Sequence, residues 1–245
     1  MKKLFALSKR NIKEMLRDPL SLVFCIAFPV LMLVMMQIIF KNVEYMPENF
    51  EIKNYAAGIC VFGYAFTGLF VALQITGDKS NSFIKRINIS PILPVTYLLS
   101  FLVSALPVTF VQTILFYAIA LIFGFPFDIN LLISIFYLIP SAVMYISFGI
   151  LVGSLCKNEK QTGPITSIFI SLAGIFGGVF MPLSSFKGGF AEFVNLLPFA
   201  HSVSIASQLP QLGAACIYPH ILFLIGYIAV AWIIIFVTRK IKNYP

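Results

Sequence analysis

The chain has 245 residues, of which 60% are hydrophobic and 11% are charged. Soluble globular domains carry about 25% charged residues, so this composition excludes that class and indicates one polytopic membrane domain. The net charge of +8 does not indicate nucleic-acid binding, because the basic residues lie beside the ends of apolar runs instead of forming a separate basic domain.

Residues 1–18 predict an amphipathic helix that lies in the membrane surface. At 100° per residue the opposite side is mostly basic, and one arc of about 120° holds Leu4, Phe5, Ser8, Ile12, Met15 and Leu16. Asp18-Pro19 is expected to end this helix, because proline restricts the residue before it and lacks an N–H donor. Alternatively, the basic residues only fix the orientation of the protein in the membrane.

Six apolar runs follow, each about 18 to 26 residues long, which at about 1.5 Å per residue is enough to cross a bilayer. All are expected to be helical, because lipid offers the backbone no other hydrogen-bond partner. The predicted fold is an all-α membrane protein with one domain at 19–245 behind the surface helix. Pro107 and Pro140 predict kinks in two spans. The runs are 20–40, 56–76, 98–123, 131–155, 164–181 and 220–238.

Lysine and arginine are distributed unevenly between the segments that separate the runs. Alternate segments, beginning with the N-terminus, hold 14 of the 17 basic residues, and the others hold three. The positive-inside rule therefore predicts a multi-pass protein of the cytoplasmic membrane with both termini in the cytoplasm.

The loop at 77–96, which this topology places in the cytoplasm, contains a short predicted helix with Phe83, Ile84 and Ile87 beside Lys85 and Arg86. Ser90-Pro91 and Pro94 close it. Apolar residues with a charged rim are typical of a helix that docks into a partner's groove. An ordinary solvated loop is the alternative.

The region 182–219 contains an uncharged, proline-broken stretch. Its piece 199–209 spans roughly 17 Å, which is too short to cross the bilayer. A re-entrant extracellular hairpin before the sixth span is predicted, because non-helical backbone at that depth must be shielded by protein or line a cavity. An amphipathic hairpin lying on the membrane is the alternative.

The spans contain no charged side chain, and the sequence contains no G-x-x-x-x-G-K-[ST] phosphate-binding loop. The first absence disfavours an ion-coupled secondary transporter, which usually needs buried ionisable groups. An intramembrane enzyme is also disfavoured, because His201 and His220 lie outside the apolar centres. Both classes remain alternatives. The Gly149–Gly153 and Gly174–Gly178 pairs would permit close helix approach.

Four segments in a fixed order carry a resemblance to a known family. They are RDPLSLVFCIAFPVLML at 17–33, FIKRINISPI at 83–92, GGVFMPLSSF at 177–186 and NLLPFAH at 195–201. With the basic N-terminus, this order resembles the type-2 ABC transporter permeases, in particular their compact drug- and polysaccharide-exporter branch. Lys187-Gly188-Gly189 departs from the pattern, since relatives often carry a proline and aromatic residues there.

The resemblance implies an exporter subunit for an amphiphilic, drug-like, lipid-linked or polysaccharide cargo. It would pair with a second permease, either an identical copy or a close paralogue. Two copies of a separate ATP-binding subunit would bind MgATP, and this chain would bind no cofactor or metal and have no catalytic residues. The residues expected to contact that subunit are Lys9, Arg10, Lys13 and Arg17 on the interfacial helix and Phe83, Ile84, Lys85, Arg86 and Pro91 on the coupling loop. Those expected in an extracellular cap are Pro182, Pro198 and His201.

Overall fold

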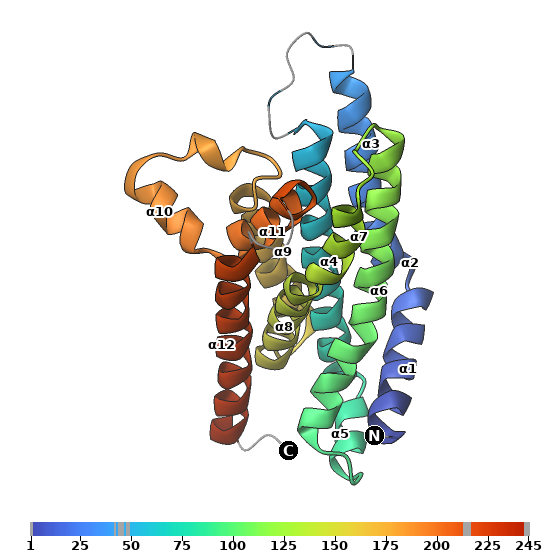
Figure 1. Ribbon diagram of the computed structural model, residues 1–245. Coiled ribbons are helices and arrows are strands. Elements are labelled where there is room, and N and C mark those ends of the chain that lie inside the picture. Colours follow the sequence, from blue (N-terminus) through green and yellow to red (C-terminus); the bar gives the residue numbers. More distant parts are fainter. Residues whose placement is uncertain (1, 42, 44–46, 48–49, 213–216, 243–245) are drawn as a thin grey trace.

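The computed structural model describes the chain except for residues 1, 42, 44–46, 48–49, 213–216 and 243–245 (Figure 1). Within the described part, every regular element is a helix. The helices form one bundle, and its two ends can be named by the elements that lie there. We call the end that carries the start of α1, the helix α5 and the end of α12 the α5 end.

The chain enters the bundle through four consecutive helical segments. They are α1 at Lys2–Arg17, α2 at Pro19–Leu22, a π-helical turn at Val23–Ala27 and α3 at Phe28–Phe40. Asp18 caps α2, since its carboxylate accepts hydrogen bonds from the backbone N–H groups of the residues two and three positions later. The predicted helix end at Asp18-Pro19 is therefore where α1 stops.

The π turn has a local cause in the sequence. Pro29 has no N–H and cannot donate to the carbonyl of Cys25, four residues before it. The wider turn at Val23–Ala27 precedes this missing hydrogen bond and joins α2 to α3 as one continuous path.

The second span is the central helix of the bundle. It is α4, Ile52–Ser80, and 89% of its most apolar stretch is buried inside the protein. The corresponding share is 22% for Pro19–Phe40 and 17% for Tyr218–Thr238. Figure 1 shows α4 enclosed by the other helices, so the core is built around it.

Two glycines of α8, Ile139–Leu155, allow it to pack backbone to backbone against α4. A Cβ atom at Gly149 would collide with the carbonyl oxygen of Gly68, and one at Gly153 would lie 2.9 Å from the Cβ of Ile75. The close approach predicted for the Gly149–Gly153 pair is confirmed, and the partner is α4 of the same chain.

Proline interrupts the predicted fourth span but not the third. α6, Pro94–Ile122, continues through Pro107 without a break. The fourth run forms α7, Ile129–Tyr137, and α8, which are separated by the single residue Leu138, two positions before Pro140. The kinks predicted at Pro107 and Pro140 stay predictions.

Five helices in the described residues are long and apolar enough to span a membrane: Pro19–Phe40, Ile52–Ser80, Pro94–Ile122, Ile129–Leu155 and Tyr218–Thr238. The predicted fifth span corresponds to α9, Glu159–Phe176, whose first turn is polar. α9 begins five residues before the predicted run and ends before residues 177–181, where Gly178 has a φ of 76°. The count of six spans stays a prediction.

The segment before the last helix contains a 3₁₀ turn at Leu183–Ser185, then α10 at Gly188–Leu196 and α11 at Pro198–Leu212. α10 stands apart from the bundle, whereas α11 packs across it near the end opposite α5 (Figure 1). The predicted short piece 199–209 falls inside α11. α12, Tyr218–Lys242, then runs back to the α5 end along α8.

The contact between α4 and α8 generates the first testable prediction. Gly149→Ala should lower the free energy of unfolding by about 1–3 kcal/mol, because the new methyl group meets a backbone carbonyl that cannot rotate away. Gly163→Ala is the matched control, because no atom lies within 4 Å of a Cβ built there. Thermal melting of the detergent-solubilised protein measures both, and equal melting temperatures would contradict the prediction.

Candidate functional site

The α5 end brings α1 together with three consecutive elements from much later in the chain: the end of α4, α5 at Phe83–Asn88 and the start of α6 (Figure 1). The helix predicted in the loop at 77–96 is present as α5. α4 extends to Ser80, four residues past the predicted end of the second span. Asp78 and Lys79, which the sequence places in a loop, therefore lie on the last turn of a helix.

Arg10 of α1 forms a bidentate ion pair with Asp78 of α4. Its Nη1 lies 2.7 Å from Asp78 Oδ2 and its Nη2 lies 2.5 Å from Asp78 Oδ1. Asp78 is 4% exposed, and Tyr97 of α6 donates its hydroxyl to the same carboxylate at 2.8 Å. Glu14 Oε1 lies 2.7 Å from Arg10 Nη2. Burial alone would lower the pKa of Arg10, because it favours the neutral form. The hydrogen bond to Asp78 and the negative charge of Asp78 outweigh this effect, so the pKa of Arg10 is raised.

The same guanidinium reaches the coupling loop. The Cζ atom of Arg10 lies 4.0 Å from the centre of the Phe83 ring, and that of Arg86 lies 5.6 Å from it. Lys3 Nζ donates a hydrogen bond to the Pro91 carbonyl at 2.6 Å. α1 therefore holds the coupling loop at both ends of α5.

One side of this loop is buried and the other is open. Ile87 is 8% exposed and packs in a core cluster with Phe83 and Ile84 against it. The open side combines basic and apolar residues, which are Lys85, Arg86, Ile89, Pro91 and Leu93. Ile89 is 88% exposed and Leu93 is 71% exposed. We call these five residues the docking rim.

The interfacial helix differs from the predicted arrangement. Lys9, Lys13 and Arg17 are exposed, but Arg10 turns inward to Asp78. The side of α1 that is buried carries Leu7, Ser8, Asn11 and Met15, whereas Phe5 and Leu16 of the predicted apolar arc are 62% and 52% exposed.

A different side of α1 is buried from the one predicted because polar side chains of α1 form hydrogen bonds with α6. Ser8 Oγ donates to the Ser100 carbonyl at 3.2 Å, and Asn11 Nδ2 donates to Ser100 Oγ at 3.0 Å. α1 runs beside the first half of α6 (Figure 1), so a protein surface as well as lipid determines its orientation.

Lys79 joins the ends of two helices. Its Nζ donates to the carbonyls of Gly153, Ser154 and Cys156 at 2.7, 2.8 and 2.7 Å. These carbonyls lie at the C-terminal end of α8, where a helix lacks intrahelical donors and carries partial negative charge. Sequence reasoning missed Asp78 and Lys79. The sequence did contain one signal for a special role of Asp78, because it is the only acidic residue between Glu51 and Asp128.

At the opposite end, the three predicted cap residues lie at separate turns. Pro182 precedes the 3₁₀ turn and Pro198 opens α11, whereas His201 meets His220 of α12. The Nδ1 atoms of the two histidines lie 2.8 Å apart, and the His201 ring stacks on Phe223 at a centroid distance of 4.2 Å. Among the described residues, no three His, Cys, Asp or Glu side chains form a metal site.

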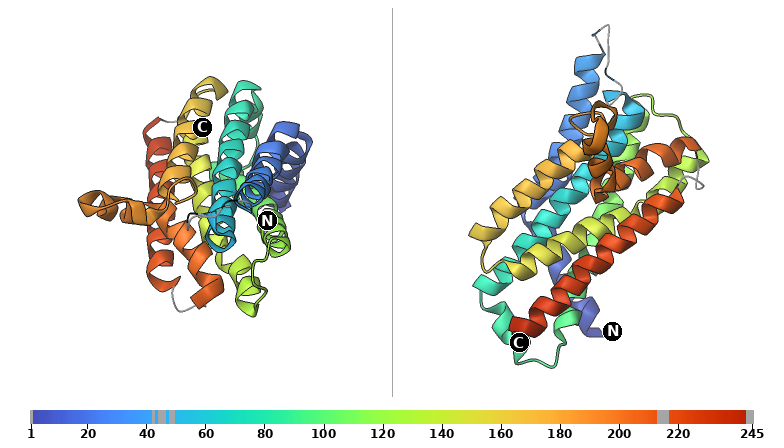
Figure 2. Two further views of the ribbon diagram at one scale, coloured as in Figure 1. Left: turned by 90° about the horizontal axis from the view of Figure 1, so that it is seen from above. Right: turned by 90° about the vertical axis from the view of Figure 1, so that its left-hand side faces the viewer.

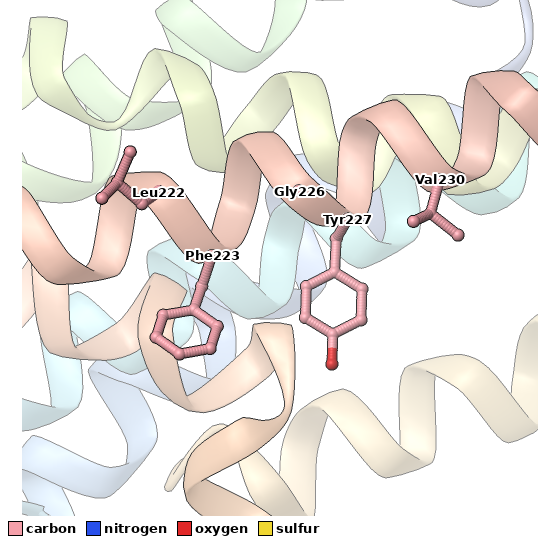
Figure 3. Close-up of a pocket in the computed structure, with 5 residues that line it drawn as sticks. All are labelled: Leu222, Phe223, Gly226, Tyr227 and Val230. Carbon is pink, nitrogen blue, oxygen red and sulfur yellow. The ribbon is translucent and has the colours of Figure 1, made fainter.

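An apolar groove follows one face of α12, which runs along the bundle beside α8 (Figure 2). It encloses about 450 Å³ and is lined by Leu222, Phe223, Gly226, Tyr227 and Val230 (Figure 3). The hydroxyl of Tyr227 donates to the Leu196 carbonyl at 2.9 Å, which ties the end of α10 to the groove.

Residues 2–209 of the chain match the model of the ABC-2 type transporter family, so the match covers α1 to most of α11. The chain belongs to the ABC-2 type transporter family. It is therefore an ABC transporter permease, and the resemblance found in the sequence is confirmed.

Two proteins that are similar to this chain also carry names of transport permeases. The chain is 22% identical over 200 residues to a probable doxorubicin resistance ABC transporter permease protein, DrrC, of Mycobacterium tuberculosis, covering 80% of this chain and 72% of that protein. It is 24% identical over 212 residues to a putative transport permease, ycf38, of Cyanophora paradoxa, covering 83% and 72%.

The ion-pair cluster generates a prediction. Asp78→Asn should lower the free energy of unfolding by about 1–3 kcal/mol, because it removes the buried charged partner of the Arg10 guanidinium and leaves only the more exposed Glu14 carboxylate. Asp128→Asn removes the same charge from an exposed helix cap, where asparagine serves as well as aspartate. Thermal melting in detergent compares the two variants, and a similar loss in both would argue against a special role for Asp78.

The histidine contact generates a pH prediction. Burial, and then the charge of His220, lower the pKa of His201 to about 4 from 6.5. Because the unfolded chain then binds more protons, the protein should lose stability as the pH falls from about 6.5 towards 4. His201→Phe should make the melting temperature less dependent on pH in this window. An unchanged pH dependence in the variant would contradict the assignment.

Proposed function

We propose that this permease is one half of an ATP-driven exporter, and that the docking rim is where a separate ATP-binding subunit attaches. The observation that carries the proposal is the exposure of Ile89 and Leu93 beside Lys85 and Arg86. Apolar side chains surrounded by basic ones at the end of a bundle fit a protein partner that buries the former and pairs with the latter.

The contacts behind the rim support a coupling role. α5 cannot move as a free loop, because Arg10 packs on Phe83 and is itself paired with Asp78 of the central helix. A force on α5 would therefore reach α1, α4 and α6 together. In the proposed cycle, two copies of the partner bind MgATP and close, and this motion changes the relative tilt of two permease subunits.

The proposed topology has six crossings, with both termini in the cytoplasm. The start of α1 and the end of α12 lie at the same end of the bundle (Figure 1), which supports an even number of crossings. α9 supplies the sixth, since its polar first turn lies at the α5 end, where Thr162 bonds to Thr76 of α4 at 3.3 Å. In this topology the polar first turn of α9 lies at the membrane surface, and the apolar remainder of α9 crosses the membrane.

Export is favoured by the name of the DrrC relative, which refers to drug resistance. The groove along α12 is apolar and belongs to the face that we propose for the cargo and for the second permease, a copy or a close paralogue. An amphiphilic cargo suits such a surface. The α10 and α11 helices form the proposed re-entrant cap above it. Family membership gives no support to the ion-coupled carrier and the intramembrane enzyme.

The docking rim is tested by reversing its charge. Lys85→Glu with Arg86→Glu should reduce recovery of the ATP-binding subunit with the tagged permease by about tenfold, which corresponds to about 1.4 kcal/mol of binding free energy. Membrane insertion should not change, because both residues are exposed. Lys187→Glu reverses an exposed charge at the other end and should leave recovery intact. Wild-type recovery with the double variant would overturn the assignment.

A further inference from the structure

A second cavity lies between α6 and the broken pair α7 and α8, away from the docking rim and from the groove along α12. It encloses about 420 Å³, which is within the range of small-molecule sites. It is lined by Tyr64, Val103, Leu106, Pro107, Thr109, Phe110, Thr113, Ile135, Leu138, Ile139 and Ala142. We call it the α6–α8 cavity.

Two prolines explain why space opens here. α7 and α8 are interrupted at Leu138, two residues before Pro140, which lacks an N–H and cannot donate to the carbonyl of Phe136. On the other wall, Pro107 lacks an N–H and cannot donate to the carbonyl of Val103. Val103 and Pro107 both line the cavity, so this carbonyl is a candidate acceptor for a ligand.

The hydroxyl groups that line the cavity all donate their hydrogens to acceptors within the protein. Thr109 Oγ1 donates to the Leu106 carbonyl at 2.9 Å, and Thr113 Oγ1 donates to the Thr109 carbonyl at 2.7 Å. Tyr64 Oη lies 2.5 Å from Thr113 Oγ1, and since the hydrogen of Thr113 is engaged, Tyr64 is the donor of this pair. These groups can therefore offer lone pairs to a ligand but no hydrogen.

The remainder of the lining is apolar, and among the described residues that line the cavity none is charged. A charged ligand would lose its hydration without gaining a partner, so the site favours a neutral one. Outside the cavity, Val111 and Phe136 are 58% and 62% exposed, and Ile139 on its rim is 38% exposed. These residues belong to the lipid-facing surface, so a ligand reaches the cavity sideways from the bilayer.

We propose that the α6–α8 cavity binds a neutral amphiphile with a hydrocarbon body and a single hydrogen-bond donor, such as the hydroxyl of a long-chain alcohol. The body fills the apolar walls, and the donor bonds to Thr109 Oγ1 or to the Val103 carbonyl. Binding at this site does not depend on the proposed export function.

Photoaffinity labelling with two matched probes tests the proposal on the purified full chain in detergent. The probes are a diazirine-bearing hexadecanol and its methyl ether, which has the same body and no donor. Peptide mapping by mass spectrometry should place the alcohol label on residues that line the cavity, with the ether labelling about fivefold less at equal concentration. Equal labelling by the two probes would overturn the proposal without the need for any variant.

Two substitutions sharpen the test. Val103→Trp should fill the cavity and remove most of the alcohol labelling, whereas Val111→Trp makes the same change on the exposed surface of α6 and should preserve it. Thr109→Val should reduce labelling by the alcohol towards the lower level expected for the ether. Equal loss of labelling in the two tryptophan variants would assign the label to the lipid-facing surface and would overturn the proposal.

The bound amphiphile could be a resident membrane lipid or a transported cargo, and the source can be distinguished. Mass spectrometry of the protein from its own membrane should reveal a neutral lipid that the alcohol probe displaces if the ligand is resident. A label that falls on addition of MgATP to the assembled transporter would instead identify cargo. Either result supports the cavity as a site for this chemistry.

Discussion

The backbone contact between α4 and α8 is the constraint on which the rest of the structure depends. At Gly68 and Gly149 the two helices approach so closely that neither position has room for a side chain. Lipid supplies no hydrophobic drive for helix association, so a membrane bundle is held by close packing and by hydrogen bonds between helices. The glycine contact supplies the packing, and Lys79 adds hydrogen bonds to the end of α8.

This pair forms the centre on which most of the other helices pack. α9, α6, α11 and α3 all pack on α4, and α12 packs on α8. The Arg10 and Asp78 ion pair then fastens α1 and the coupling loop to the same central helix. Breaking one partner of such a buried pair is costlier than its net contribution to stability, because the other charge remains buried. We infer that the cluster specifies the position of α5 more than it stabilises the fold.

Prolines shape the two sides of the bundle differently. On the first span, Pro29 is accommodated by a π turn and the helical path continues. Between α7 and α8, the interruption at Leu138 lies two residues before Pro140, and Leu138 lines the α6–α8 cavity. The same residue type is thus accompanied by a π turn in the first span and by an interrupted helix beside a cavity in the fourth.

The amino-acid sequence by itself determined the membrane class, the largely helical nature of the apolar runs, the family and the short helix in the loop at 77–96. These follow from local rules, because lipid forces backbone hydrogen bonds within the helix and proline acts on its own turn. Only the tertiary structure decided that Arg10 faces Asp78, that Phe5 is exposed while Asn11 is buried, and that His201 meets His220. Arg10 and Asp78 are 68 residues apart, and Asn11 and its partner Ser100 are 89 apart. Periodicity along one helix contains no information about which neighbour will cover each face.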